Sequence, residues 1–548
     1  MVRILACFLF AFLANLSADG QSLKRPRLVV GIVVDQMRQD YLYRFYDRYS
    51  ENGFKRLLKG GFQCEQTYIN YLPAYTAPGH ACIYTGTVPA VHGIAGNDWI
   101  DIYSGKRWYC VEDTSVTPVE CSMAAGRMSP SSLRTTTITD ELMLATRARS
   151  RVVGIALKDR GSILPAGHLG KAYWFDDSTG NFITSSYYAD ALPSWLKSFN
   201  GRRLTDSLLS QPWNTLYPAG TYVQSLPDDN PYEGRFDKSK PPVFPHHPGK
   251  GKSYGNIRRL PAGNTLTLEA AKAALTGEQM GKGRFPDFLC VSLSSTDYIG
   301  HQFTPESIEI EDMYLRLDQE LAEFFHFLDR HAGKGNYLLF LTADHGGAHN
   351  AKYLQDIGIP AGNIGNDHLN ELVTGATRKA LDQLQVREIQ TGGLIKGVEN
   401  YQIFLNKEGI RDAHLDEARF RNALKKALSD IPEMAWVLDM EAVASTPMPA
   451  IIKEKAVNGY YHHRSGDLLM IFQPGYYNGY DATGTTHGTW HPYDTRIPLL
   501  WYGWGIQPGR LNRKVHMEDI APTIATLLGI QVPNGCTGNV ITELTDGQ

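Results

Sequence analysis

LLFLTADHGGAHN, residues 338–350, is a short apolar run that ends abruptly in Asp344, His345 and two glycines. An apolar run of this length, bounded by glycine, predicts a strand buried on both faces. The carboxyl end of such a strand delivers polar residues into a crevice. A carboxylate beside an imidazole at that place suggests metal ligands, although neighbouring Asp and His residues also occur as hydrogen-bonded turns.

The same pattern, polar residues with metal-binding side chains after an apolar run, recurs in three other segments. LVVGIVVDQMRQDYL places Asp35, DFLCVSLSSTDYIGH places Asp297 and His301, and GTTHGTWHPYD places His487. Asp297 and His301 are four residues apart and could bind one ion from a single helical turn. The four segments together supply six carboxylate and imidazole ligands, a set that suits two zinc ions.

The composition indicates a large globular protein. The chain has 548 residues, of which 43% are hydrophobic, and its length allows about two to four domains. The formal net charge of −3 gives neither the basic field of a nucleic-acid-binding protein nor the acidic excess of a disordered one. We therefore expect no nucleic-acid partner.

The N-terminus has the features of a secretory signal peptide. A basic start is followed by the apolar run ILACFLFAFLANL and then by small residues, which predicts a signal over residues 1–20 with cleavage near Ala18–Gln21. The mature chain, 21–548, is then periplasmic or secreted and has no stable membrane anchor. A membrane-anchored N-terminus is the alternative.

Six cysteines follow the signal, and an even number in an exported chain permits disulfides. Cys110 and Cys121 form the most local candidate pair. Cys290 lies in a strand-like run, where a free buried thiol is as reasonable as a paired one.

Strands and helices alternate along the chain, which predicts an α/β fold with a mostly parallel central sheet and helices on both faces. The pattern is carried by strand 28–34 with helix 41–58, helix 136–146 with strand 152–157, helix 266–275 with strand 288–293, helix 307–331 with strand 337–341, and late strands at 467–472 and 497–502.

Two segments depart from this alternation. Residues 161–260 are rich in Pro, Gly, Tyr and Trp and predict an irregular insertion over the site. Residues 351–460 contain helix-like stretches at 369–385 and 415–429 and the short strand YQIFLN, which predict an inserted α/β subdomain.

The segment YLPAYTAPGHACIYTGTVPAVHGIAGNDW, residues 71–99, supplies a candidate nucleophile. Thr76 precedes Ala77, Pro78 and Gly79 and is predicted to cap a helix. Its hydroxyl would then lie where helix N–H groups converge on an anion. The plainer alternative is that Thr76 only caps the helix.

Seven stretches together resemble the alkaline phosphatase superfamily: IVVDQMR, AYTAPGHACIYTG, HGIAGNDW, ALKDRGS, SSTDYIGH, LTADHG and THGTWHPYDTRIPLLWYG. They are most similar to the PafA-like bacterial alkaline phosphatases, which use Thr as the nucleophile, and the similarity covers nearly all of the mature chain in order. The resemblance implies an alkaline-phosphatase-like sheet with inserted segments, a phosphomonoesterase activity and a monomer.

The resemblance also implies roles for individual residues. One zinc would be held by Asp297, His301 and His487, and the other by Asp35, Asp344 and His345, with Thr76 bound to the second. Asn97, Lys158 and Arg160 would contact the phosphoryl oxygens. His349 and His491 lie four residues after His345 and His487, and the match to the motifs favours the earlier member of each pair. His80, His92, His462 and His463 match no role and are expected to be structural or surface residues.

Charge distinguishes a monoesterase from the nearest alternative, a phosphodiesterase or nucleotide pyrophosphatase of the same superfamily. Three aspartates and a Thr76 alkoxide would balance two Zn²⁺ ions, which leaves Lys158 and Arg160 to compensate a monoester dianion. These two residues stand two apart, so on an extended segment they would point to the same side. The diesterase branch lacks this basic pair.

The predicted function is zinc-dependent hydrolysis of small phosphate monoesters by in-line attack of Thr76, through a phosphothreonine intermediate. The sulfatase signature CxPxR is absent, since residues 76–80 read TAPGH. A secreted binding protein with a structural metal would need closed four-ligand sites.

Overall fold

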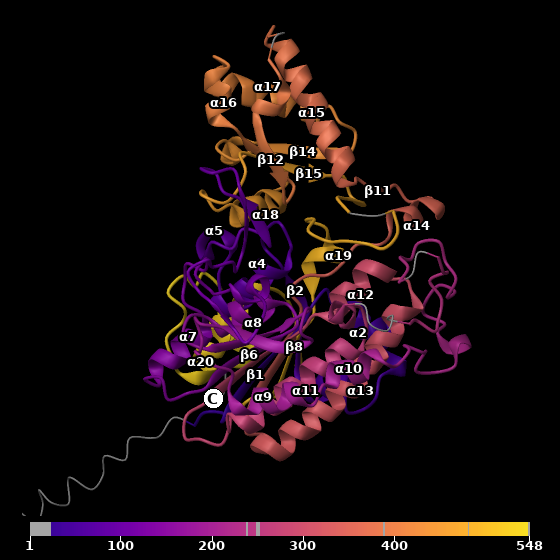
Figure 1. Ribbon diagram of the computed structural model, residues 1–548, viewed down its shortest axis with the longest axis vertical. Coiled ribbons are helices and arrows are strands. Elements are labelled where there is room, and N and C mark those ends of the chain that lie inside the picture. Colours follow the sequence, from indigo (N-terminus) through magenta and orange to yellow (C-terminus); the bar gives the residue numbers. More distant parts are fainter. Residues whose placement is uncertain (1–23, 237–238, 248–252, 387–388, 480–481, 546–548) are drawn as a thin grey trace, which may run out of the picture.

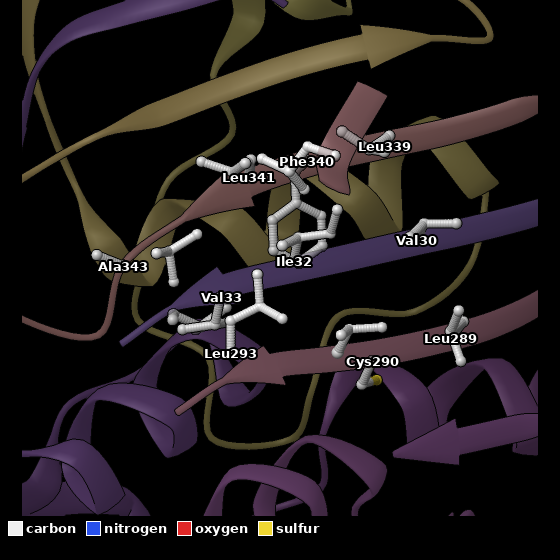
Figure 2. Close-up of a cluster of buried hydrophobic side chains, with 14 of the residues drawn as sticks. Val30, Ile32, Val33, Leu289, Cys290, Leu293, Leu339, Phe340, Leu341 and Ala343 are labelled. Carbon is white, nitrogen blue, oxygen red and sulfur yellow. The ribbon is translucent and has the colours of Figure 1, made fainter. Parts of the chain in front are cut away.

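Three neighbouring strands with almost uninterrupted apolar sequences form the centre of the fold. In the computed structural model, β1 (Leu28–Val34) lies between β9 (Asp287–Leu293) and β10 (Tyr337–Thr342), and the three strands run parallel. Every residue in them is buried, which explains why the apolar residues do not alternate with polar ones. Figure 2 shows their side chains packed into one cluster. The strands predicted at 28–34, 288–293 and 337–341 are confirmed.

The structure describes residues 24–236, 239–247, 253–386, 389–479 and 482–545, so the predicted signal peptide lies outside the described residues. Within them, the main sheet has 11 strands in the order β17-β2-β18-β10-β1-β9-β6-β7-β8-β5, with β19 paired to β2. The other bounds are β2 Phe62–Tyr68, β5 Pro118–Val119, β6 Val152–Ala156, β7 Lys171–Asp176, β8 Asn181–Ser185, β17 Arg496–Ile497, β18 Leu499–Gly503 and β19 Gly509–His516.

The pairing is parallel from β10 to β7 through β1, β9 and β6, and antiparallel at β18, β8 and β5. The mostly parallel α/β sheet predicted from the sequence is therefore confirmed in its central part. Helices cover both faces (Figure 1). On one face lie α4 (Thr76–Thr85), α7 (Ile138–Ala145), α8 (Asp159–Ala166) and α20 (Ile520–Leu528), and on the other α9 (Ser194–Gly201), α10 (Leu204–Leu209), α11 (Ala262–Gly277), α12 (Ser295–Phe303) and α13 (Ile308–Leu328).

Shorter elements connect this framework. They are α2 Tyr41–Arg44, α3 Phe54–Gly60, α5 Pro89–His92, α6 Met123–Gly126, α14 Ala351–Asp356 and α19 Pro492–Thr495; the 3-10 turns η1 Tyr46–Arg48, η2 Ala219–Thr221, η3 Tyr254–Arg259, η7 Met517–Asp519 and η8 Thr542–Leu544; the π-helical turn η4 Asp329–Gly333; and the strand pairs β3 Asp98–Ile100 with β4 Arg107–Tyr109 and β11 Gly362–Asn363 with β16 Tyr476–Tyr477.

The helix predicted over 41–58 is wrong as a single element, because the chain there forms α2, η1 and α3. The carboxylate of Asp318 on α13 accepts hydrogen bonds from the N–H groups of Ser50 and Phe54, both at 2.7 Å. The bond from Phe54 satisfies the first N–H of α3 from outside the helix, and the bond from Ser50 fixes the chain before it, so a new helix begins at Phe54.

The segment predicted to be an irregular insertion, 161–260, is regular over its first half. β7 and β8 extend the main sheet, and α9 and α10 cover it. These strands were missed because their many aromatic residues lie among the glycines and polar residues that are typical of loops. The remainder, from about 211 to 253, contains only η2 among the described helices and strands.

A second sheet with its own core lies above the main one in Figure 1. Its strand order is β12-β13-β15-β14. Its elements are β12 Ile395–Glu399, β13 Gln402–Leu405, β14 Met434–Asp439, β15 Leu468–Phe472, α15 Asn366–Gln383, η5 Thr391–Gly393, α16 Lys407–Asp412, α17 Glu417–Ser429, η6 Val443–Ser445 and α18 Ala450–Gly459. The assignment of 467–472 to the main sheet was wrong: β15 pairs with β13 and β14, partners that an apolar run does not reveal.

All six described cysteines are free thiols, including Cys110 and Cys121, and Cys290 is buried in β9. Among the described residues, no helix combines the length and the apolar character that a membrane-spanning segment needs.

Candidate active site

The candidate residues gather where the parallel strands end. Asp35 follows β1 directly, and its N–H donates to the carbonyl oxygen of Leu293 at the end of β9 (3.2 Å). Asp344 and His345 follow β10, and Asp297 and His301 lie on α12, which begins two residues after β9. Parallel strands end at the same edge of a sheet, so this topology brings these three segments together.

The first cluster consists of Asp297, His301 and His487. Asp297 Oδ1 lies 3.2 Å from His301 Nε2 and 3.6 Å from His487 Nε2. The ligand atoms of all three lie within 4.8 Å of one another, as a shared metal ion requires.

The second cluster is centred on His345. His345 Nε2 lies 3.5 Å from Asp35 Oδ1 and 3.5 Å from Asp344 Oδ2. Asp297 also comes within 4.8 Å of Asp35 and His345, so its carboxylate lies between the two clusters. The rings of His345 and His487 stack with centroids 3.5 Å apart, which makes the clusters direct neighbours.

The three histidines are oriented in the same way. The Nδ1 atoms of His301, His345 and His487 lie 2.8, 2.9 and 2.8 Å from the carbonyl oxygens of Thr485, Gly346 and Ala74. A carbonyl oxygen only accepts, so each Nδ1 carries the proton and each Nε2 presents its lone pair to the carboxylates. A hydrogen bond from Nδ1–H to a carbonyl oxygen is typical of a histidine that binds a metal through Nε2.

Two of the buried carboxylate oxygens lack a hydrogen-bond partner within the described part of the chain. Asp35 Oδ1 and Asp344 Oδ2 are buried and have no hydrogen-bond partner among the described residues. Burial, and then the charge of Asp344, raise the pKa of Asp35 well above its ordinary value. Buried carboxylates of this kind are normally paired or bound to a metal, so the residues present fit divalent cations.

Among the described residues, Lys158 is the lysine or arginine that forms ion pairs with these carboxylates. Its Nζ lies 2.6 Å from Asp35 Oδ2 and 2.6 Å from Asp297 Oδ2. Although burial opposes it, the charges of Asp297 and Asp35 raise the pKa of Lys158, so the side chain is an ammonium.

Thr76 is the first residue of α4 and is buried. Its Oγ1 lies 3.3 Å from Lys158 Nζ and 3.4 Å from His345 Nε2. The N-cap of α4 is Tyr75 rather than Thr76, so the predicted capping role is wrong. The oxygen is directed into the site because Tyr75, the residue before it, takes the extended N-cap conformation.

Asn97 and Arg160 lie around the same helix end. Asn97 Oδ1 accepts from the N–H of Ala77, the second residue of α4 (2.9 Å). Arg160 Nη1 donates to the hydroxyl of Tyr109 (2.9 Å), which in turn donates to Asp159. Lys158 is the N-cap of α8 and Arg160 lies in its first turn, so the expectation of an extended segment is wrong: Lys158 alone reaches Thr76.

The two alternative histidines lie outside the clusters. His349 contacts Glu306 through Nδ1, and its Nε2 lies 3.1 Å from Arg38 Nη1. His491 packs between the rings of Trp490 and Tyr493. Within the described residues, neither belongs to a group with the spacing of metal ligands. His345 and His487 are the members of the two pairs that lie in the clusters.

Sequence reasoning missed two residues that contact these clusters. His80, expected to be structural, lies one helical turn after Thr76 with its Nδ1 2.8 Å from Thr76 O and 3.4 Å from Asp344 Oδ2. Gln36 donates from Nε2 to Asp297 Oδ1 (2.9 Å) and from its backbone to Asp344 Oδ1 (3.2 Å). The position of Gln36 next to Asp35 was a usable signal. His92 is buried, and His462 and His463 are exposed.

A cavity of about 970 Å³ adjoins the first cluster at His301. Tyr298, Gln302, Arg259 and Asp229 are among its lining residues. Charged, polar and aromatic side chains line this cavity, so it can accept polar groups of different shapes.

The family described as type I phosphodiesterase / nucleotide pyrophosphatase matches the chain over residues 29–494. A protein of Myroides odoratus named calcium-transporting ATPase is 49% identical, with 99% of this chain and 98% of that protein covered. Alkaline phosphatase PafA of Elizabethkingia meningoseptica is 46% identical, with 95% of each chain covered.

A solved structure gives the same result for the fold. The crystal structure of wild-type alkaline phosphatase PafA superposes with a TM-score of 0.91 at 45% identity, and the match covers 95% of this chain and 99% of that one.

Proposed function

The chain belongs to the type I phosphodiesterase / nucleotide pyrophosphatase family and is an alkaline phosphatase, and we propose that it hydrolyses phosphate monoesters through a phosphothreonine formed on Thr76 with the help of two zinc ions. The observation that carries the mechanism is the position of Thr76 Oγ1, at a helix N-terminus beside Lys158 Nζ and His345 Nε2.

The two clusters are the proposed zinc sites. Asp297, His301 and His487 would hold one ion, and Asp35, Asp344 and His345 the other, together with Thr76. The lone pairs at the three Nε2 atoms and the unpartnered oxygens of Asp35 and Asp344 support this assignment. When bound, zinc lowers the pKa of a hydroxyl and stabilises negative charge on oxygen.

Thr76 Oγ1 attacks phosphorus in line with the ester oxygen, which leaves with the electron pair of its bond to phosphorus. Water then attacks the phosphothreonine, so that inorganic phosphate leaves and the Thr76 hydroxyl is restored. His80 keeps this helix end next to Asp344, because its ring contacts both Thr76 O and Asp344.

Three side chains would bind the phosphoryl oxygens. Asn97 is anchored through Oδ1 to the Ala77 N–H, which leaves its amide N–H groups to donate to substrate. Lys158 already reaches Thr76, and Tyr109 orients the Arg160 guanidinium. Each such contact is worth about 2–4 kcal/mol in the transition state.

The two cations favour a phosphate monoester over a diester. A monoester dianion matches Lys158 and Arg160, whereas a diester monoanion leaves one positive charge uncompensated. The leaving group would enter the cavity beside His301. We further propose a monomer that is exported through the signal at residues 1–20.

The decisive experiment combines metal analysis with phosphate release from the wild type, Thr76→Ala and Thr76→Ser. We expect two zinc ions per chain, near-complete loss of turnover for Thr76→Ala, and turnover within about tenfold of wild type for Thr76→Ser, which keeps the hydroxyl. A Thr76→Ala variant with wild-type turnover would exclude the phosphothreonine.

A further inference from the structure

A second cavity, of about 490 Å³, lies away from the metal ligands, between the β3–β4 hairpin and the turn that follows α18. Three segments form it: Trp99 to Trp108 of the hairpin, Ser131 to Arg134 of the loop before α7, and Tyr461 to Arg464. The volume is in the range of small-molecule sites. Neither the family resemblance nor the proposed reaction assigns it a role.

One wall of this cavity is cationic. Arg464 is 8% exposed and donates through Nη1 to the carbonyl oxygens of Gly93 and Ser132. Its Nε and Nη2 make no hydrogen bond within the described chain. Arg134 is exposed, and its guanidinium has neither a hydrogen bond nor a carboxylate partner among the described residues. Burial, and then the charge of Arg134, lower the pKa of Arg464 to about 10.

The acid in the wall does not neutralise these guanidinium groups. Asp101 Oδ1 accepts from the N–H and the hydroxyl of Ser104, both at 2.7 Å, in the hairpin turn. Two cations therefore face the cavity against one carboxylate that is already hydrogen-bonded, and an anion would complete the charge.

Aromatic side chains adjoin the cations, and the Arg464 guanidinium lies over the Trp99 ring, 4.6 Å from its centroid. Trp99 and Trp108 are paired across β3 and β4 and line the cavity together. Tyr103, at the turn, is 76% exposed, and Tyr461 lies 5.3 Å from the Arg464 guanidinium. Trp99 is only 3% exposed, so Tyr103 and the half-buried Trp108 offer the ring surface that can stack on an aromatic ring or on the apolar face of a sugar ring.

The hairpin separates this cavity from the reaction site. Neighbouring residues in a strand point to opposite faces, so Tyr109, which binds Arg160, and Trp108, which lines the cavity, lie on different sides of β4. A ligand can occupy the cavity without touching Arg160.

We propose that this cavity binds a small anion that carries a ring, with its acid group on Arg134 and Arg464 and its ring on Trp108 and Tyr103. Two sources share this chemistry, an acidic sugar and an aromatic acid. The lining does not require a phosphate ester, so the site acts independently of the hydrolytic reaction.

The test uses the full-length, metal-loaded enzyme and two probes, glucuronate and 2-naphthalenesulfonate, titrated by calorimetry and tryptophan fluorescence. At least one probe should bind with a dissociation constant below about 10 mM. Arg134→Gln and Tyr103→Ala should each weaken binding about tenfold, and glucose or 2-naphthol should bind about tenfold more weakly than the matching anion. Arg284→Gln, at another exposed arginine without a partner in the described chain, should leave binding unchanged.

Hydrolysis of an aryl phosphate should be unaffected by Arg134→Gln and by a saturating probe. Binding of glucuronate alone identifies an acidic sugar, and binding of the sulfonate alone identifies an aromatic acid. The proposal is overturned if neither probe binds, if Arg134→Gln behaves like Arg284→Gln, or if the probe inhibits hydrolysis competitively. Absence of phosphatase activity would contradict the proposed function without affecting these binding results.

Discussion

Lys158 contacts Thr76, and Arg160 contacts Tyr109, although both side chains would bind the phosphoryl group. We predict that Lys158→Ala and Arg160→Ala each reduce kcat/KM for an aryl phosphate monoester by about 10²–10³-fold, equivalent to about 2.7–4 kcal/mol. The loss for the matching methyl diester should be at least about tenfold smaller, because that substrate carries one negative charge fewer. Steady-state kinetics on the two esters measures the difference, and equal losses would favour a diesterase.

His92 carries the clearest prediction about pH. Burial, and then the charge of Arg464, lower the pKa of His92 to about 3, compared with an ordinary value of about 6.5. As the pH falls below 6.5, the unfolded chain takes up a proton at His92 that the folded chain does not. Stability should therefore fall by about 1.4 kcal/mol per pH unit between pH 6.5 and about 3 from this group alone.

His92→Asn isolates this effect. The asparagine oxygen can replace His92 Nδ1 as the acceptor for the Ile94 N–H, and it does not titrate. Denaturant unfolding of both proteins from pH 7 to pH 4 should show the stability of the wild type, relative to the variant, declining with the predicted slope. A difference that is independent of pH would show that His92 is not the group responsible.

Some residues of the candidate site could be predicted from the sequence, and others could not. Asp35, Asp344 and Asp297 were identifiable because each follows a buried strand, and strand ends converge by topology. Thr76 lies beside these residues, but its expected capping role is wrong, because the N-cap position depends on backbone angles. His80 and Gln36 were missed because their contacts join segments far apart in sequence.

At the scale of elements, α4 is held against the end of β10 by a close approach at Gly79. A Cβ at this position would lie 2.6 Å from Asp344 O and 2.7 Å from Asp344 Cβ. We predict that Gly79→Ala pushes Thr76 away from the metal ligands, lowers kcat about 10²-fold and destabilises the protein by about 1–3 kcal/mol.

Gly375→Ala is the matched control for this substitution. Gly375 lies in α15, and a Cβ there meets no atom within 4 Å. The substitution should leave kcat unchanged and stabilise the helix by about 0.5–1 kcal/mol. Thermal unfolding and turnover of the two variants test the argument, which fails if Gly79→Ala turns over like the wild type.

Elements were predictable where the sequence pattern is local. The buried strands β1, β9 and β10 have continuous apolar runs, and α13 has a long helical period. The break between α2 and α3 depends on Asp318, which is distant in sequence, and the sheet to which β15 belongs depends on its pairing partners. Tertiary contacts decided the elements that sequence reasoning missed.

At the scale of the whole molecule, the proposed metal sites couple the reaction to stability. Asp35, Asp344 and Asp297 are 0, 0 and 4% exposed, and only Lys158 among the described cations forms an ion pair of the lysine or arginine type with them. Removal of metal with a chelator should abolish turnover and lower Tm by several degrees, because a ligand that binds only the folded state stabilises it. Added zinc should restore both quantities. An unchanged Tm after verified metal loss would contradict the proposed sites.

The two cores meet at the site through the segment that carries His487. Tyr401, from the smaller core, lies with its hydroxyl 3.4 Å from His487 O, whereas His487 Nδ1 contacts Ala74 O in the larger one. Both cores therefore position a proposed ligand.

Asp35 and His487 stand far apart along the polypeptide, near its beginning and its end. A chain truncated before position 487 lacks one corner of the first cluster, so with the proposed ligands we expect it not to hydrolyse an ester. Turnover should then appear only after the late segment has docked onto the rest of the fold.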